Sequence, residues 1–241
     1  MSGGGHPLPA LTGGEGPHAG RRLATAGAPL SRARLALLML HGRGGSPEDM
    51  IALADHLALP DVAVVAPEAA DRSWWPNSFL APLAANEPGL SSGLSVVADL
   101  VETLARAGFG PERVALSGFS QGACLAAEAA ALIAKPFATV AVLSGGLVGS
   151  TEADGDATDE LYGHRPKTFA YDGNLAGVPV LLGCHERDPH IPLRRVRETG
   201  HVLKAMGAGV DTMVLPGAGH GIVAEEAAWL RKRLNTNEVV R

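Results

Sequence analysis

From about Arg34 onward, short runs of apolar residues alternate with longer segments in which apolar residues recur every three or four positions. This alternation is typical of β-α-β units arranged around a mostly parallel sheet. The short runs are continuously apolar, which favours strands that helices cover on both faces. Six runs are expected to be strands, over residues 35–40, 62–66, 114–117, 139–143, 178–183 and 210–215, and a weaker signal at 21–26 indicates an additional edge strand.

Capping residues mark the ends of the helical segments. Ser46 is followed by Pro47 and Asp49, an arrangement typical of a helix N-terminus, and Gly108 lies where a C-terminal glycine is expected. Helices are expected over residues 46–57, 94–107, 121–134, 193–206 and 223–234. The sequence therefore predicts an α/β fold, with a mostly parallel central sheet of about six to seven strands and helices on both faces.

The chain has 241 residues, which suits one large domain or two small ones. We expect a flexible Gly/Pro-rich tail at residues 1–17, a single α/β domain over 18–234 and a C-terminal tail at 235–241. Residues 150–177 form a long connection between two expected strands, and connections of this length are usually functional or disordered. A surface excursion is the favoured interpretation of this insertion, and a lid or a dimer contact is the functional alternative.

Composition and charge narrow the classes of protein that remain. Hydrophobic residues make up 46% and charged residues 19% of the chain, which indicates a globular protein. The formal net charge is −5, so no basic surface for nucleic acid or anionic membrane is expected. The start of the chain lacks a secretory signal and no apolar run reaches the length of a membrane span, which predicts a cytoplasmic protein without membrane insertion. Cys124 and Cys184 exclude a disulfide framework; two buried thiols are favoured over a single bridge.

A G-x-S-x-G run follows one expected strand and precedes an Ala-rich expected helix, and its central residue is Ser120. A strand-to-helix turn this tight presents the serine hydroxyl at the edge of the sheet. Gly118 and Gly122 are the positions where a Cβ would collide with neighbouring elements. Ser120 is therefore the candidate nucleophile.

A serine hydroxyl needs a base within hydrogen-bond distance, and that base needs an acid to orient it. His220 lies in a glycine-rich loop after the last expected strand, and Asp188 lies just past the end of the strand before it. The order Ser120, Asp188, His220 is the one found in α/β-hydrolases. Glu186 and Asp172 remain as weaker alternatives for the acid.

Two further constellations accompany these residues. The developing oxyanion needs backbone donors, and we expect them to be the N–H of Gln121 and that of Arg43, with the N–H of Gly44 as the alternative to Arg43. His41 is expected to fix this loop. A metal site is a minor alternative for the side chains of His185, Glu186, Asp188 and His190; no metal is expected, because the segment is short and contains two prolines.

Aromatic residues gather in one stretch, residues 71–79, directly after an expected strand end. Three of the ten aromatic residues of the chain lie within positions 74–79, which favours an apolar substrate pocket over simple packing against the sheet. The predicted pocket residues are Trp74, Trp75, Phe79 and Phe119. The sequence does not decide whether the side chains of Arg43 and Arg72 contact substrate.

The motifs HGRGG, SWWP, GFSQG, DPHIP and PGAGHGI together resemble the phospholipase/carboxylesterase branch of the α/β-hydrolase superfamily, over residues 18–234. The resemblance implies Ser120, Asp188 and His220 as a catalytic triad, with main-chain donors at Arg43 and Gln121, and no cofactor. The long insertion and the bulky aromatic stretch indicate a narrow pocket, so we expect a serine carboxylesterase acting on small or short-chain esters. The alternatives are a lysophospholipase or acyl-protein thioesterase, and a non-catalytic scaffold that binds a small ligand. A homodimer is one predicted state.

Overall fold

The computed structural model of the chain describes residues 16–151 and 155–235, so the predicted tails at 1–17 and 235–241 lie almost entirely outside the described residues. Seven strands form one sheet in the order β1-β3-β2-β4-β5-β6-β7. Only β1 is antiparallel to its neighbour, and the other pairs of adjacent strands are parallel. The strands are β1 (Leu23–Gly27), β2 (Leu35–Leu40), β3 (Val62–Pro67), β4 (Val114–Phe119), β5 (Thr139–Leu143), β6 (Pro179–Arg187) and β7 (Gly209–Ala218). The predicted mostly parallel α/β fold is confirmed.

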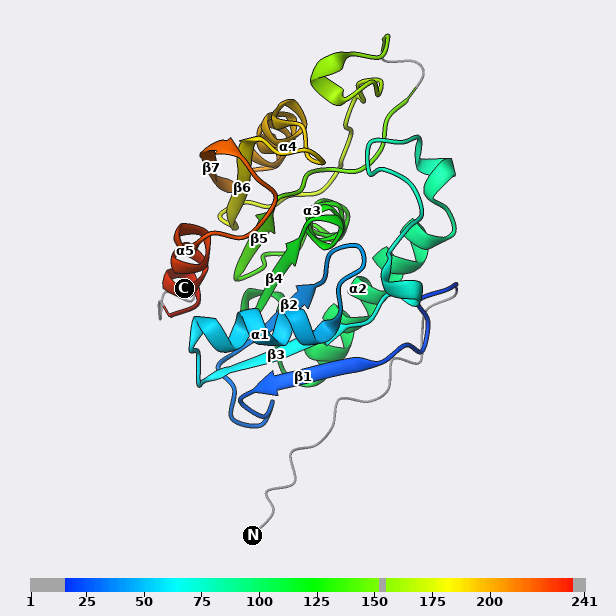
Figure 1. The fold of residues 1–241 in the computed structure, drawn as a ribbon. Coiled ribbons are helices and arrows are strands. Elements are labelled where there is room, and N and C mark those ends of the chain that lie inside the picture. The colour runs from blue at the N-terminus through cyan, green and yellow to red at the C-terminus, as the bar shows by residue number, and fades with distance from the viewer. Residues whose placement is uncertain (1–15, 152–154, 236–241) are drawn as a thin grey trace.

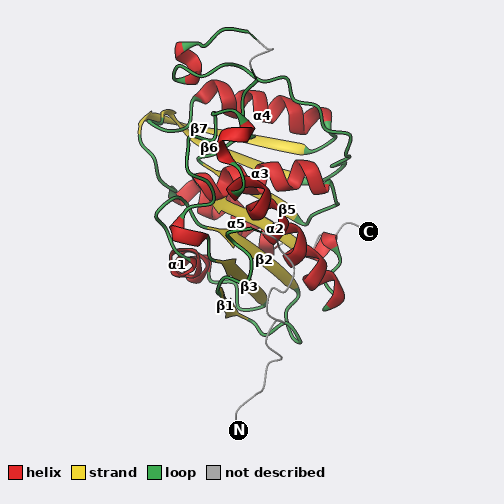
Figure 2. Cartoon of the chain, turned by 90° about the vertical axis from the view of Figure 1, so that its right-hand side faces the viewer, coloured by secondary structure: helices red, strands yellow, loops and turns green. Residues whose placement is uncertain are grey.

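Helices cover both faces of this sheet (Figures 1 and 2). The α-helices are α1 (Pro47–Leu57), α2 (Gly89–Arg106), α3 (Gln121–Ile133), α4 (Leu193–Ala205) and α5 (Ala224–Asn235). Short 3₁₀-helices occur at η1 (Ala70–Arg72), η2 (Leu83–Asn86), η3 (Pro111–Arg113) and η5 (Asp159–Leu161). In the part of the chain that the structure describes, no helix combines the length and the apolar character that crossing a bilayer requires.

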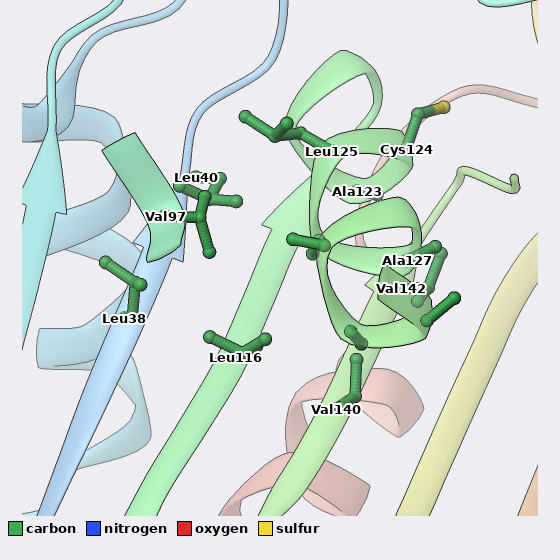
Figure 3. Close-up of a cluster of buried hydrophobic side chains, with 14 of the residues drawn as sticks. Leu38, Leu40, Val97, Leu116, Ala123, Cys124, Leu125, Ala127, Val140 and Val142 are labelled. Carbon is green, nitrogen blue, oxygen red and sulfur yellow. The ribbon is translucent and has the colours of Figure 1, made fainter. Parts of the chain in front are cut away.

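Alternate residues of each central strand enter two separate cores, which explains the continuous apolar runs. On β2, Leu38 and Leu40 belong to the core that also contains residues of α2, α3 and α4, whereas Leu37 and Met39 belong to the core that contains residues of α1 and α5. Figure 3 shows the first core, in which α3 lies over the apolar side chains of β2, β4 and β5. The Ala-rich sequence of α3 suits this place, because small side chains let a helix approach the sheet closely.

Helix α2 begins five residues before the predicted start at residue 94. Its first residue, Gly89, lies against the loop that carries Trp74: a Cβ on Gly89 would be 2.5 Å from the Trp74 carbonyl oxygen. The close approach of these two segments therefore requires a glycine at this position. In the sequence, glycine and serine residues at the start of a helix indicate a loop instead. Helix α1 begins as predicted, with a capping box formed by Ser46 and Asp49.

Candidate active site

Ser120 occupies a sharp turn between β4 and α3, with φ 54° and ψ −118°. This left-handed backbone is strained for a residue with a side chain, and the Ser120 N–H is held by the Leu143 carbonyl oxygen at 2.9 Å. A Cβ on Gly118 would lie 2.2 Å from the Gly122 carbonyl oxygen, and a Cβ on Gly122 would lie 2.1 Å from that of Leu40. The two glycines are thus required by backbone atoms that cannot move aside.

Three strand ends bring a serine, a histidine and an aspartate together. His220 follows β7, and its Nε2 lies 2.8 Å from Ser120 Oγ. Its Nδ1 lies 2.8 Å from Oδ2 of Asp188, which follows β6. The other carboxylate oxygen, Oδ1, accepts hydrogen bonds from the N–H groups of His190 at 2.8 Å and Ile191 at 3.0 Å. Both oxygens of this buried carboxylate therefore have partners.

The environment of Asp188 keeps its carboxylate ionised. Burial alone would raise its pKa, but the hydrogen bond to His220 and those from the two N–H groups outweigh burial and hold the pKa below its ordinary value. An ionised Asp188 accepts the Nδ1–H of His220, which leaves Nε2 free to take the proton of Ser120. The geometry and the charge state thus fit a nucleophile, a base and an orienting acid.

The weaker alternatives for these roles lie elsewhere. Glu186 is exposed and accepts a hydrogen bond from the Gly217 N–H at 3.2 Å, and Asp172 is exposed within the insertion. Across the described ranges, no three His, Cys, Asp or Glu side chains are grouped so that they could share a metal ion. Cys124 and Cys184 are both free and buried, and burial raises the pKa of each thiol to about 12, so neither is a thiolate at neutral pH.

The two backbone N–H groups predicted as oxyanion donors belong to residues that line a cavity beside Ser120. Gln121 is the first residue of α3, so its N–H is one of the unpaired donors at a helix N-terminus. Within residues 16–151 and 155–235, no hydrogen bond engages the N–H of Gln121 or that of Arg43. The N–H of Gly44 instead donates to the Arg72 carbonyl oxygen at 2.7 Å. This pairing favours Arg43 over Gly44 as the second donor.

His41 fixes the loop that carries Arg43. Its Nε2 accepts a hydrogen bond from the Ala69 N–H at 3.1 Å, and its Nδ1 donates to the Gly42 carbonyl oxygen at 2.7 Å. Burial lowers the pKa of His41, so the ring is neutral and can accept at one nitrogen while it donates at the other. The Trp74 indole N–H donates to the His41 carbonyl oxygen at 2.9 Å. The segment after β3 and the aromatic stretch therefore hold this loop in place.

A cavity of about 450 Å³ opens beside Ser120. Three of the four predicted pocket residues, Trp75, Phe79 and Phe119, line it. The prediction for Trp74 is wrong: its side chain is fully buried and packs against the rings of His18, at 5.2 Å between centroids, and His41, at 5.3 Å. The cavity is lined by Gly42, Arg43, Trp75, Pro76, Asn77, Ser78, Phe79, Phe119, Ser120, Gln121, Cys124, His190, Ile191 and His220.

Two residues that support the site escaped the sequence analysis. His18, the first residue of the predicted domain, is buried; its Nδ1 accepts from the Ala70 N–H and its Nε2 donates to the Trp74 carbonyl oxygen, both at 2.9 Å. The Gln121 side chain, considered only for its backbone, accepts from the Trp74 N–H at 2.9 Å and donates to the Trp75 carbonyl oxygen at 2.8 Å. No sequence pattern marks either contact, because the partners are about 50 residues apart in the chain.

The described part of the insertion at 150–177, yellow-green in Figure 1, lies beyond α4 and contributes no residue to the cavity lining. It contacts the loop that carries Asp188 instead. The Tyr162 hydroxyl donates to the Asp188 carbonyl oxygen, and Arg194 on α4 forms an ion pair with Glu160 at 2.8 Å. Tyr171 anchors the insertion's other end, through a 2.9 Å hydrogen bond from its hydroxyl to the buried carboxylate of Glu128 on α3.

The chain matches a known protein family over most of its length. The model of the phospholipase/carboxylesterase family covers residues 24–238. Acyl-protein thioesterase 1 of Gibberella zeae is 31% identical over 145 residues, which cover 56% of this chain and 54% of that protein. The chain thus aligns with about half the length of this curated relative.

Solved structures agree with the family match. The crystal structure of a phospholipase/carboxylesterase from Dyadobacter fermentans is 33% identical, with a TM-score of 0.81 over 93% of this chain and 100% of that one. A carboxylesterase from Mesorhizobium loti shares the fold, with 21% identity and a TM-score of 0.61 over 85% of this chain and 90% of that one. The α/β-hydrolase resemblance predicted from the sequence motifs is confirmed, and the chain belongs to the phospholipase/carboxylesterase family.

Proposed function

We propose that the protein is a serine carboxylesterase that hydrolyses small or short-chain esters through a covalent acyl-enzyme on Ser120. One observation carries the proposal: Ser120, His220 and Asp188 are joined by two hydrogen bonds of 2.8 Å at the mouth of a cavity. This linkage activates a hydroxyl that is otherwise a weak nucleophile at neutral pH. The family match and the α/β-hydrolase fold support the same reaction type.

The first half of the reaction forms the acyl-enzyme. Ser120 Oγ attacks the ester carbonyl carbon while its proton passes to Nε2 of His220, and Asp188 stabilises the resulting imidazolium. The carbonyl oxygen becomes an oxyanion that accepts hydrogen bonds from the N–H groups of Gln121 and Arg43. The carbonyl then re-forms, the bond to the alcohol oxygen breaks, and His220 returns its proton to that oxygen.

The second half releases the acid. Water enters the place of the alcohol and attacks the acyl carbon while His220 takes its proton. The same two N–H groups hold the second oxyanion, and its collapse breaks the bond to Ser120 Oγ, which recovers its proton from His220. Neither half requires an electron carrier or a further co-reactant besides water.

The shape of the cavity supports a small substrate. Its volume of about 450 Å³ lies toward the lower end of the range of roughly 300–1,000 Å³ found for small-molecule sites. Trp75 and Phe79 form bulky walls beside the serine. The thioesterase name of the Gibberella zeae relative keeps a long-chain acyl substrate as the second candidate.

Ser120→Ala tests the proposal. We expect the variant to lose hydrolysis of p-nitrophenyl butyrate by at least about 10³-fold, with an unchanged circular dichroism spectrum and melting temperature. Ser91→Ala, on α2 and away from the cavity lining, is the matched control and should retain full activity. Full activity of Ser120→Ala would overturn the proposal, and a steep rise of kcat/KM toward p-nitrophenyl laurate would favour the long-chain candidate.

Two finer statements accompany this proposal. A reducing compartment such as the cytoplasm is supported by two cysteines that are both free and buried. The homodimer stays a prediction, and light scattering of the purified protein at several concentrations tests it.

A further inference from the structure

The structure separates the two arginines that the sequence left undecided. The Arg43 side chain lines the cavity together with Ser120. Arg72 does not line it; its Nε donates to the Gly45 carbonyl oxygen of the same loop at 3.0 Å. Arg43 therefore borders the cavity, and Arg72, its neighbour in space, provides a matched control.

Arg43 brings an uncompensated charge to the cavity. Among the lining residues, all within the described ranges, it is the only Lys, Arg, Asp or Glu. The ion pairs of the described chain do not include it. Partial burial lowers its pKa, but a guanidinium stays charged across the physiological range. The acid of the site, Asp188, is buried with both oxygens engaged by other partners, so it does not pair with Arg43.

The guanidinium is held in place with donors to spare. Its Nη1 donates to the Pro76 carbonyl oxygen at 2.8 Å and its Nη2 donates to that of Asn77 at 2.5 Å. These contacts use two of the five N–H groups of an arginine, and three remain for a ligand. Carbonyl oxygens carry no net charge, so they orient the guanidinium without neutralising it. A group fixed in this way loses little conformational entropy when it binds a partner.

We propose that the Arg43 guanidinium binds a carboxylate of the substrate, so that the preferred substrates are small esters that carry a carboxylate group within reach of the scissile bond. This inference rests on the proposed esterase function. A carboxylate suits the site because its two oxygens match the planar guanidinium. The apolar part of the lining, which includes Trp75, Phe79 and Ile191, fits the carbon skeleton between the ester and the carboxylate.

The carboxylate can belong to the acid part or to the alcohol part of the ester, and two pairs of substrates distinguish these sources. Mono-4-nitrophenyl adipate and its methyl ester vary the charge of the acid part. 4-Acetoxybenzoate and methyl 4-acetoxybenzoate vary the charge of the alcohol part. In each pair, the ratio of kcat/KM for the charged ester to that for the neutral ester measures recognition of the charge.

We expect the wild-type ratio to exceed one in at least one pair, and Arg43→Gln to lower that ratio about tenfold, which corresponds to about 1.4 kcal/mol. Arg43→Lys should retain part of the preference, because it keeps the charge without the planar fork. Arg72→Gln should leave the ratio unchanged. Arg43 also carries a proposed oxyanion donor, so its variants are expected to lose some activity on every ester; the ratio within one variant cancels that loss.

A wild-type ratio of one or less in both pairs overturns the inference, and so does a ratio that Arg43→Gln leaves unchanged. If Arg43→Gln does not fold, the wild type decides: raising NaCl from about 50 mM to about 500 mM should reduce the ratio, because salt screens the attraction, and a flat ratio overturns the inference. In these cases the neutral esters are still hydrolysed, and the proposed function stands. Failure of the function itself is recognised separately, by turnover of the neutral esters that survives Ser120→Ala.

Discussion

Replacing Gln121 by methionine would remove the side-chain amide that joins α3 to the aromatic stretch, while the length of the side chain and the backbone N–H stay. The amide accepts hydrogen bonds from the Trp74 N–H at 2.9 Å and the Ser73 hydroxyl at 3.3 Å, and donates to the Trp75 carbonyl oxygen at 2.8 Å. The residue is 6% exposed, so water does not easily replace these partners. The proposed oxyanion donor itself is untouched.

The cost follows from which partners remain. In the variant, the buried Trp74 N–H has no acceptor, a loss of about 1–3 kcal/mol. The Trp75 carbonyl oxygen still accepts from the Ser73 hydroxyl at 2.8 Å, so the second lost bond costs only about 0.5–1.5 kcal/mol. We therefore expect the free energy of unfolding to fall by about 3 kcal/mol, out of about 5–15 kcal/mol for a typical domain.

Urea unfolding followed by tryptophan fluorescence measures this change, because Trp74 and Trp75 are both buried next to the substituted side chain. With a slope of about 3 kcal/mol/M, the midpoint should move down by about 1 M. Gln121→Glu would bury a carboxylate opposite the Trp75 carbonyl oxygen, so at neutral pH its loss should be at least as large. Unfolding of Gln121→Met within about 0.5 kcal/mol of wild type would refute the reasoning.

Two further predictions concern the loop that carries Asp188 and helix α5, which carries Glu226. Tyr162→Phe removes the hydroxyl that donates to the Asp188 carbonyl oxygen. We expect kcat for p-nitrophenyl butyrate to fall several-fold while KM stays unchanged. An unchanged kcat would show that the insertion does not position Asp188. Burial raises the pKa of Glu226, so the folded state retains a proton on this carboxyl group that the unfolded state releases. The free energy of unfolding therefore falls as pH rises from about 4.3, the pKa of an unfolded glutamate, through the raised pKa of the folded state. Glu226→Gln should remove this loss, so in urea unfolding the variant should be more stable than wild type at pH 8 but not at pH 4. The same stability difference between variant and wild type at both pH values would contradict this prediction.

The sheet and the ends of its strands were predictable because the underlying physics is local. A strand covered on both faces is apolar at every position, as in residues 35–40, and such runs stand out without any knowledge of their neighbours. The carboxyl ends of parallel strands share one edge, so Ser120, Asp188 and His220 could be assigned to one place from their positions alone. The structure places these three side chains together at that edge.

What the sequence could not predict depends on contacts between distant segments. Trp74 and Trp75 are adjacent and chemically identical, and only their surroundings decide that one packs under the loop while the other lines the cavity. The pairing of His18 with Trp74 spans 56 residues and carries no periodic signal. The start of α2 at Gly89 was missed for the same reason, since that glycine is required by the Trp74 carbonyl oxygen and not by the helix.

These distant contacts have a mechanistic consequence. The loop that carries the Arg43 N–H is bound to the cavity wall through the guanidinium of the same residue, which reaches Pro76 and Asn77. The wall is in turn bound to the nucleophile's helix through the side chain of Gln121, whose own N–H is the other proposed oxyanion donor. Each of the two donors therefore belongs to a residue whose side chain also shapes the pocket. A substitution at either position changes substrate fit and oxyanion binding together, so rates on one ester cannot separate these effects, whereas ratios between matched esters can.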